Sequence, residues 1–210
     1  MTKKKVVEAV EDEVVKPIST LWVFFALGVL GVGLFAFFLL TASPASSSFE
    51  LNGFTFEQAA CPSVEGRCWQ TTVVSNVGVH PITFYSDPRE VDWIPVSREA
   101  VLAVLNLTYS SQNSLTIAFD EGVPGEVGVA ASLLARVTGE RLYNIPTRGA
   151  VYGEGTHCSL STSRDRVVYL TQGERDAVFV RDGCVIVSAR STSSLISVVD
   201  AYVMHLLLIL

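Results

Sequence analysis

Apolar and polar positions divide the chain into a short tail, a continuous apolar run and a longer stretch of mixed pattern. Thr20–Ala42 is almost wholly apolar, and no charged side chain occurs between Pro17 and Phe49. A helix needs about 20 consecutive apolar residues to cross the hydrocarbon core of a bilayer. Leu21–Leu40 meets that length without a polar side chain, so we predict one transmembrane helix over residues 18–42.

The charges on either side of this run predict its orientation. Lys3–Lys5 and Lys16 precede it, whereas residues 43–49 on the far side carry no charge. Lys and Arg close to a span stay in the cytoplasm, and acidic residues contribute little to this bias. We therefore expect a cytoplasmic tail over residues 1–17, a linker over residues 43–49 and an extracytoplasmic domain over residues 50–210.

A cleaved secretory signal is the alternative to a retained anchor. The apolar run is longer than the usual apolar region of such a signal, and Pro44 fits a small-residue cleavage site badly. We therefore favour a single-pass protein of the cell membrane.

After the linker the pattern changes to short strands and amphipathic helices. A β-meander is expected between Glu50 and Tyr85, followed by short helices that end near Trp93 and Leu105. Later strands are expected at 114–119, 166–171, 177–180 and 184–189, and the main helices at about 126–138 and 192–210. Pro146–Gly155 is expected to be irregular. This order predicts an α+β (mixed α/β) domain whose sheet is packed by two main helices.

The helix faces and turns follow from residue types. Ser191 is the expected cap of the last helix, and Gln172-Gly173 and Asp182-Gly183 are expected to supply turns between strands. The apolar stripes of the two main helices are expected to be buried; they comprise Val127, Ala130, Ala131, Leu134 and Val137 in the first, and Leu195, Val198, Val199, Tyr202, Leu206 and Ile209 in the second.

Charge excludes one class of partner. The formal net charge is −6, and every Lys lies within the first 16 residues, so the predicted domain has Arg but no Lys. Its basic residues are scattered rather than gathered in a patch, which argues against nucleic-acid binding.

The cysteines support an oxidising compartment. All four, Cys61, Cys68, Cys158 and Cys184, lie in the predicted extracytoplasmic part. Four cysteines allow three pairings; we favour 61–68, which would close a small loop, and 158–184, which would join neighbouring strands. The alternative is a metal site that uses these cysteines with His157. No C-x-x-C spacing supports zinc, so we expect neither a metal nor a cofactor.

The most distinctive polar motif is Asp87-Pro-Arg-Glu90. Asp can cap a helix, Pro fits its first position, and Glu90 could reach back to the cap amide. Arg89 is expected to pair locally. Capping accounts for this motif without a function, but we keep Asp87, Arg89 and Glu90 as candidate functional residues.

Two further segments bear on chemistry. Asn106-Leu-Thr108 is a glycosylation sequon, which has meaning if the domain lies outside the cell. Gly122–Gly128 follows a strand and opens a helix where a phosphate-binding loop would lie, but it matches neither common phosphate-loop pattern. We assign no catalytic residue.

Two segments carry a family resemblance. Thr83–Val96 is similar to an aromatic-x-x-D-P-R-E-x-x-x-I-P-V segment of uncharacterised, single-pass, membrane-anchored archaeal envelope proteins. The strand from Cys184 and the closing helix also resemble theirs, except that Leu206–Leu210 replaces the usual Gly near the helix end. The resemblance implies an envelope location and an α+β domain, and it implies no activity.

The sequence therefore predicts a non-catalytic binding or structural protein of the cell envelope, whose partner is another envelope protein or a glycan. One alternative is a subunit of a membrane assembly, held through the tail with Val7, Val10 and Val14 on one helical face, and through the span, where the small residues Gly28, Gly31, Gly33 and Ala36 can let two helices approach closely and self-associate. The other is an extracytoplasmic hydrolase that uses dispersed carboxylates; its candidates are Asp87, Glu90, Asp120 and Glu121.

Overall fold

The computed structural model describes Phe24 and residues 28–32, 47–62, 66–75, 78–120, 125–139, 142–152 (backbone only for 150–152) and 158–210. It divides into two compact units, Met1–Ala45 and Ser46–Leu210. In the first unit, Phe24 and residues 28–32 are helical and exposed. The predicted tail and most of the predicted span lie outside the described residues. Among the described helices, none combines the length and apolar character needed to cross a membrane.

The second unit begins with a four-stranded antiparallel meander, in the order β1-β2-β3-β4. Its strands are β1 (Ser48–Leu51), β2 (Phe54–Ala60), β3 (Arg67–Ser75) and β4 (Gly78–Phe84). Asn52 and Gly53 join β1 to β2 with positive φ angles of 48° and 84°. Asn-Gly is the preferred pair for such a two-residue hairpin turn.

A second, mixed sheet has five strands in the order β6-β5-β7-β9-β8. They are β5 (Ser114–Asp120), β6 (Thr147–Tyr152), β7 (Asp165–Gln172), β8 (Ala177–Arg181) and β9 (Cys184–Ala189). All neighbours are parallel except β8 and β9, which form an antiparallel hairpin. Asp182 and Gly183 form its turn with φ angles of 51° and 74°, which confirms that predicted turn.

The helices are α2 (Arg98–Leu105), α3 (Gly125–Thr138) and α4 (Thr192–Leu206). Short 3-10 turns occur at η1 (Pro88–Glu90), η2 (Asn106–Tyr109) and η3 (Cys158–Leu160). Ser191 caps α4 as predicted, with its hydroxyl accepting from the Ser194 amide. Ser97 caps α2 in the same way.

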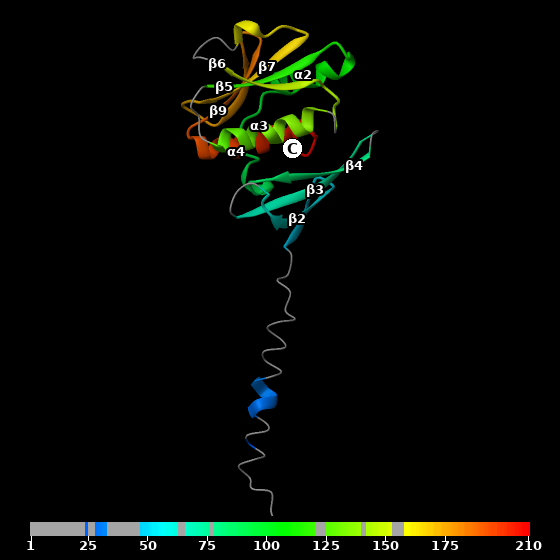
Figure 1. Ribbon diagram of the computed structural model, residues 1–210, viewed down its shortest axis with the longest axis vertical. Helices are drawn as coiled ribbons and strands as arrows, with labels where there is room; N and C mark the ends of the chain where they lie inside the picture. The colour runs from blue at the N-terminus through cyan, green and yellow to red at the C-terminus, as the bar shows by residue number, and fades with distance from the viewer. Residues whose placement is uncertain are drawn as a thin grey trace, which may run out of the picture. The chain divides into compact units, whose positions relative to one another are not determined.

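The second unit has three layers, with α3 and α4 between the five-stranded sheet and the meander (Figure 1). One hydrophobic core joins all three layers, including Phe56 and Phe84 of the meander, Leu134 of α3 and Val187 of β9. Because α4 has a sheet on either side, it is buried on nearly all faces, as expected of a helix that is apolar all round.

These observations confirm the α+β fold class, the meander, and the packing of a sheet by two main helices. The predicted stripe of α4 is fully buried, whereas the predicted stripe of α3 differs from the structure at two residues. Leu133 belongs to the buried side and Ala131 is only half-buried.

Several predicted elements are wrong in detail. The segment expected to be irregular contains β6, which pairs parallel to β5. Gln172-Gly173 does not turn between adjacent strands, because β9 lies between β7 and β8. The expected helix after Asp87 is the three-residue turn η1. The predicted linker overlaps β1, which begins at Ser48.

The five-stranded sheet has its helices on one side. Strand residues such as Leu115, Val168 and Val187 contact the helices, and their neighbours along each strand point the other way. We call this other side the open face because no described helix packs on it; its strand residues include Thr116, Ala118, Val167, Tyr169, Thr171, Phe179, Arg181, Cys184, Ile186 and Ser188, and most of them are buried. Parallel sheets are usually covered on both faces. Of the described elements, η3 is the one fixed onto this face, through Cys158.

Candidate functional site

The Asp87-Pro-Arg-Glu90 motif is built around one ion pair. Arg89 Nε donates to Asp87 Oδ1 at 2.9 Å, and Arg89 Nη2 donates to Asp87 Oδ2 at 2.6 Å. The Asp87 carboxylate also accepts from the Arg89 amide at 2.9 Å, which confirms its capping role. The hydrogen bonds from Arg89 hold the pKa of Asp87 below its usual value.

The same guanidinium lies on the aromatic residues of the meander. Arg89 Cζ is 4.2 Å from the ring centroid of Phe49 and 5.4 Å from that of Trp69. Glu90 is exposed, and its side chain makes no hydrogen bond to a described residue, so its expected reach back to the cap is wrong. The motif thus fastens η1 to β1 and β3, and Asp87 and Arg89 are used structurally.

A buried carboxylate holds the chain just before this motif. Asp200 of α4 is fully buried, and its Oδ2 accepts from the amides of Tyr85 at 3.0 Å and Ser86 at 2.7 Å. Its Oδ1 has no partner among the described residues. Burial raises the pKa of Asp200 to about 7, although the hydrogen bonds from Ser86 and Tyr85 act in the opposite direction. Asp200 therefore joins α4 to the end of β4.

The structure does not gather the carboxylates of the hydrolase hypothesis. Asp87 follows the meander, whereas Asp120 ends β5 in the other sheet and accepts from the Tyr169 hydroxyl at 2.6 Å. Glu121 lies outside the described residues. The described residues contain no group of three or more His, Cys, Asp or Glu side chains that could hold a metal ion.

Both expected disulfides are present. Cys61–Cys68 joins β2 to β3 across their connection, and Cys158–Cys184 fastens η3 to β9 on the open face. His157, which the metal alternative required, lies outside the described residues. The disulfides indicate an oxidising, extracytoplasmic location.

The sequon is accessible. Asn106 is exposed at the end of α2, and the Thr108 hydroxyl donates to the Leu105 carbonyl at 2.7 Å. The next residue, Tyr109, is 86% exposed, so the surface around Asn106 has room for a glycan.

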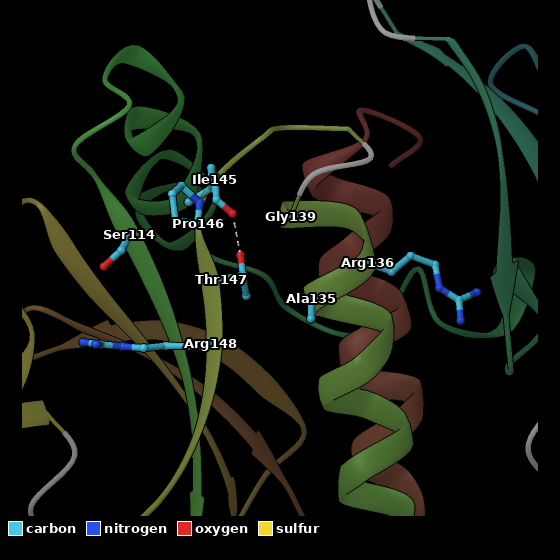
Figure 2. A pocket seen from close by; sticks show the side chains of 8 residues that line it. All are labelled: Ser114, Ala135, Arg136, Gly139, Ile145, Pro146, Thr147 and Arg148. Carbon is cyan, nitrogen blue, oxygen red and sulfur yellow. Dashed lines mark hydrogen bonds between the residues drawn. The ribbon is translucent and has the colours of Figure 1, made fainter.

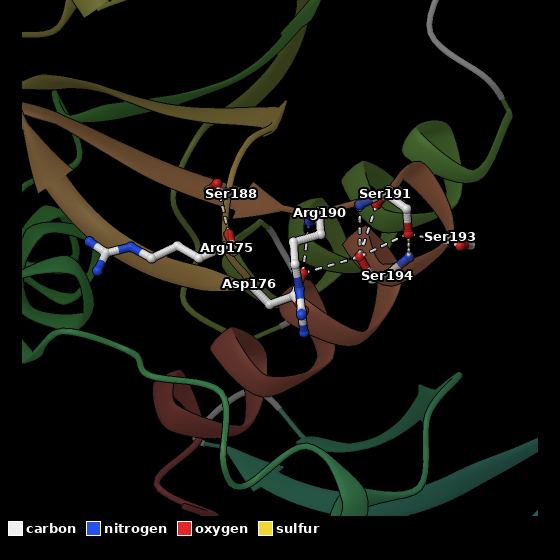
Figure 3. A network of polar contacts seen from close by, with 7 residues as sticks. All are labelled: Arg175, Asp176, Ser188, Arg190, Ser191, Ser193 and Ser194. Atoms are coloured by element: carbon white, nitrogen blue, oxygen red, sulfur yellow. Dashed lines mark hydrogen bonds and ion pairs between the residues drawn. The ribbon is translucent and has the colours of Figure 1, made fainter.

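A polar network occupies the start of α4 (Figure 3). Arg190 donates to Asp176 Oδ2 from Nε at 2.9 Å and from Nη2 at 2.8 Å, and Ser194 donates to Asp176 Oδ1. Burial alone would raise the pKa of Asp176, but the hydrogen bonds from Arg190 and Ser194 outweigh it and lower the pKa. This carboxylate occupies the positive end of the helix dipole, so the network is structural.

Arg175 precedes this network but turns away from it, over the sheet (Figure 3). There it borders a cavity of about 630 Å³ on the open face, which we call the open-face pocket. Its lining residues are Tyr169, Thr171, Gln172, Gly173, Glu174, Arg175, Phe179, Arg181, Ile186 and Ser188. The chain passes close to β9 at Gly173, where a Cβ atom would lie 2.3 Å from Ser188 Oγ, so a larger residue would require that hydroxyl to move.

Two guanidinium groups in the open-face pocket share one aromatic ring. Arg175 Cζ lies 5.4 Å and Arg181 Cζ 5.3 Å from the Phe179 ring centroid, within range of a cation–π interaction. No carboxylate of the described residues pairs with either arginine. Because guanidinium is always charged, the pocket carries fixed positive charge beside a single acidic lining residue, Glu174.

A second cavity, of about 580 Å³, lies between the end of α3 and the starts of β5 and β6. Its charged side chains diverge: Arg136 points away from the sheet on one side, and Arg148 points away on the other (Figure 2). Arg148 Nε donates instead to the Thr116 hydroxyl at 2.9 Å. Such divergence gives this cavity no set of groups aimed at one ligand.

A third cavity, of about 710 Å³, lies against the meander and includes Leu207. Its acidic lining residue is Glu57, and it has no basic one. The open-face pocket is therefore the strongest candidate site in the described part of the chain, because charge and aromatic surface meet there.

The chain finds no match among protein-family models, curated proteins or solved structures. The site must therefore be judged by its own geometry.

Sequence reasoning missed the open-face pocket. Its residues come from three consecutive strands and from the connection between β7 and β8, but in the sheet β9 lies between the other two. Alternation within the sequence Ala177–Arg181 does place Phe179 and Arg181 on one face. Only the strand order shows that Tyr169 and Ile186 lie on the same face beside these two residues.

Proposed function

We propose that this chain is a membrane-anchored, non-catalytic binding protein of the cell envelope, and that its binding surface is the open-face pocket. The observation that carries the proposal is the cavity on the open face, where two arginines without carboxylate partners in the described chain lie beside Phe179. A concave site that combines aromatic surface with charged groups is the usual form of a ligand-binding site.

The uses of the other polar groups support a binding role over a hydrolytic one. Asp87 is engaged by Arg89, Asp176 by Arg190, and Asp200 by two backbone amides. These carboxylates are engaged in holding elements together, and no two of them converge on a cavity.

The anchor and its orientation belong to the same proposal. The apolar run over residues 18–42 would hold the domain at the outer surface of the membrane, with the tail in the cytoplasm. The two disulfides support this arrangement because such bonds persist in oxidising compartments. The resemblance to archaeal envelope proteins is consistent with it.

Photo-crosslinking in the producing cells tests the proposal. Benzoylphenylalanine is placed at Gln172, which lines the open-face pocket, and as a matched control at Gln112, an exposed residue outside it. We expect a discrete envelope adduct from Gln172 and none from Gln112. The absence of an adduct at Gln172, or the same adducts from both positions, would contradict the proposal.

Glycosylation tests the orientation. If the domain lies outside, Asn106 is expected to carry a glycan in a producing cell that modifies this sequon. The intact mass of the full-length chain should then fall by one glycan in Asn106→Gln. An unmodified Asn106, in cells shown to modify a reporter sequon on a secreted protein, would count against an outside domain.

A further inference from the structure

We propose that the open-face pocket binds a carboxylated sugar, the uronic acid unit of an acidic envelope glycan. This inference rests on the proposed function, since it names the ligand class of the same surface. The charge of the pocket, its size and the hydrogen-bonding groups of its floor all favour this ligand.

Charge favours an anionic ligand. The chain as a whole is acidic, with a formal net charge of −6, yet the open-face pocket brings both Arg175 and Arg181 beside the Phe179 ring, with Glu174 as its acidic lining residue. Guanidinium binds carboxylate through paired, charge-assisted hydrogen bonds. Both arginines are exposed, and their guanidinium groups have these donors available, because neither guanidinium donates to or pairs with a described residue.

Size favours a small ligand over a protein surface. The volume of about 630 Å³ lies within the range of ordinary small-molecule pockets, about 300–1,000 Å³. A stable protein partner instead covers about 800 Å² and centres on an apolar anchor. Here the aromatic ring of Phe179 is already flanked by two guanidinium groups, which leaves little apolar surface for such an anchor.

The floor of the pocket favours a ligand that carries hydroxyl groups. The hydroxyl of Ser188 donates to the Arg175 carbonyl at 2.9 Å, and that of Thr171 donates to the Gln172 carbonyl at 3.3 Å. Because both protons are used within the protein, these oxygens face a ligand as acceptors. The side-chain amide of Gln172 donates to the Arg190 carbonyl, which leaves its oxygen as a third acceptor. The inorganic phosphate dianion has one hydroxyl proton to offer these three acceptors, whereas a uronic acid has several hydroxyl groups.

Calorimetric titration of the full-length chain in nanodiscs tests the proposal. The probe is trigalacturonate, and its fully methyl-esterified form is the matched neutral control. Triglutamate represents an acidic protein segment, and inorganic phosphate represents a simple anion. We expect trigalacturonate to bind and the other three to bind at least about tenfold more weakly, which is the effect of losing one charge-assisted contact.

Variants connect the binding to the pocket. Arg175→Gln and Arg181→Gln are each expected to weaken trigalacturonate binding about tenfold or more. Arg98→Gln, on the exposed surface of α2, is expected to leave it unchanged. Thermal unfolding of each variant checks that the fold is retained.

The outcomes separate this inference from the proposed function. Binding of trigalacturonate that both pocket variants weaken supports the inference. Equal binding of triglutamate or phosphate overturns the sugar class, while an adduct from Gln172 would still uphold the binding surface. Binding that neither pocket variant weakens, or no binding of trigalacturonate, overturns the inference. If Gln172 also yields no adduct, the proposed function fails with it.

Discussion

At the scale of single residues, polar groups in this protein join segments that are distant in sequence. Arg89 connects η1 to the aromatic rings of the meander, and Asp200 connects α4 to the end of β4. A single substitution at either residue would remove these contacts. Arg89 acts at the surface and Asp200 acts inside the core, so the two differ in their sensitivity to pH.

Replacing Arg89 tests the structural role of the Asp-Pro-Arg-Glu motif. Arg89→Gln removes both the paired hydrogen bonds to Asp87 and the charge over Phe49, so we expect a lower unfolding midpoint. Arg89→Lys keeps the charge but not the planar, two-pronged guanidinium, so its unfolding midpoint should lie between those of the wild type and Arg89→Gln. Thermal unfolding measures this, with Arg98→Gln as the control. An unchanged unfolding midpoint in Arg89→Gln would show that Arg89 does not stabilise the fold.

Asp200 predicts a specific pH dependence. Its pKa is about 7 in the folded chain and near 3.8 when unfolded, so the folded state holds the proton more tightly. Its contribution to stability is therefore present in full at acid pH and is lost as the pH rises from about 4 to about 7. Asp200→Asn cannot ionise, so its stability relative to the wild type should improve over that interval. Denaturant unfolding at several pH values measures the difference, and a difference that stays constant with pH would refute this prediction.

At the scale of elements, α4 shows how a helix ends without the usual glycine. Leu208 has a φ of 60°, in the left-handed region. The amide of Ile209 donates to the Met204 carbonyl at 2.9 Å, and that of Leu208 donates to the His205 carbonyl at 3.2 Å. This is the Schellman pattern, in which glycine normally occupies the position of Leu208.

Leu208→Gly is therefore expected to stabilise the protein. A side chain in the left-handed region costs about 1–2 kcal/mol, and the greater freedom of glycine in the unfolded chain offsets about half of that. Leu208 is 75% exposed, so little packing is lost. We expect a gain of about 1 kcal/mol in the free energy of unfolding. Leu208→Ala keeps the strain and should give no gain; equal effects of the two changes would contradict this explanation.

At the scale of the whole molecule, three layers share one core, and the disulfides act at its periphery. Cys61–Cys68 joins residues 7 apart in sequence within the meander, whereas Cys158–Cys184 joins residues 26 apart and fastens η3 to the open face. The second bond thus constrains a longer loop and shapes the face that carries the candidate site.

The two disulfides should differ in their effect on stability. In the chain-entropy model, the longer loop contributes about 3–4 kcal/mol and the shorter about 2–3 kcal/mol to the free energy of unfolding. We expect the double variant Cys158→Ser/Cys184→Ser to be less stable than Cys61→Ser/Cys68→Ser in denaturant unfolding. The reverse order would show that loop length does not decide the effect.

The sequence by itself determined the local elements, because periodicity and turn residues act over short distances. It predicted the α+β class, most strands, the buried stripe of α4, the cap at Ser191, the turn at Asp182-Gly183 and both disulfide pairs. It missed β6, since a strand at the edge of a sheet needs no strong apolar pattern when β5 supplies its hydrogen bonds.

Only the tertiary structure decided the strand order and, with it, the candidate site. Hydrogen bonding placed β9 between β7 and β8, which brought Tyr169, Phe179 and Ile186 to one face. The layering put α3 and α4 between two sheets, so that, among the described elements, the opposite face of the five-stranded sheet carries no α-helix. Contacts of this kind join different strands, and local patterns carry no information about which strands will pair.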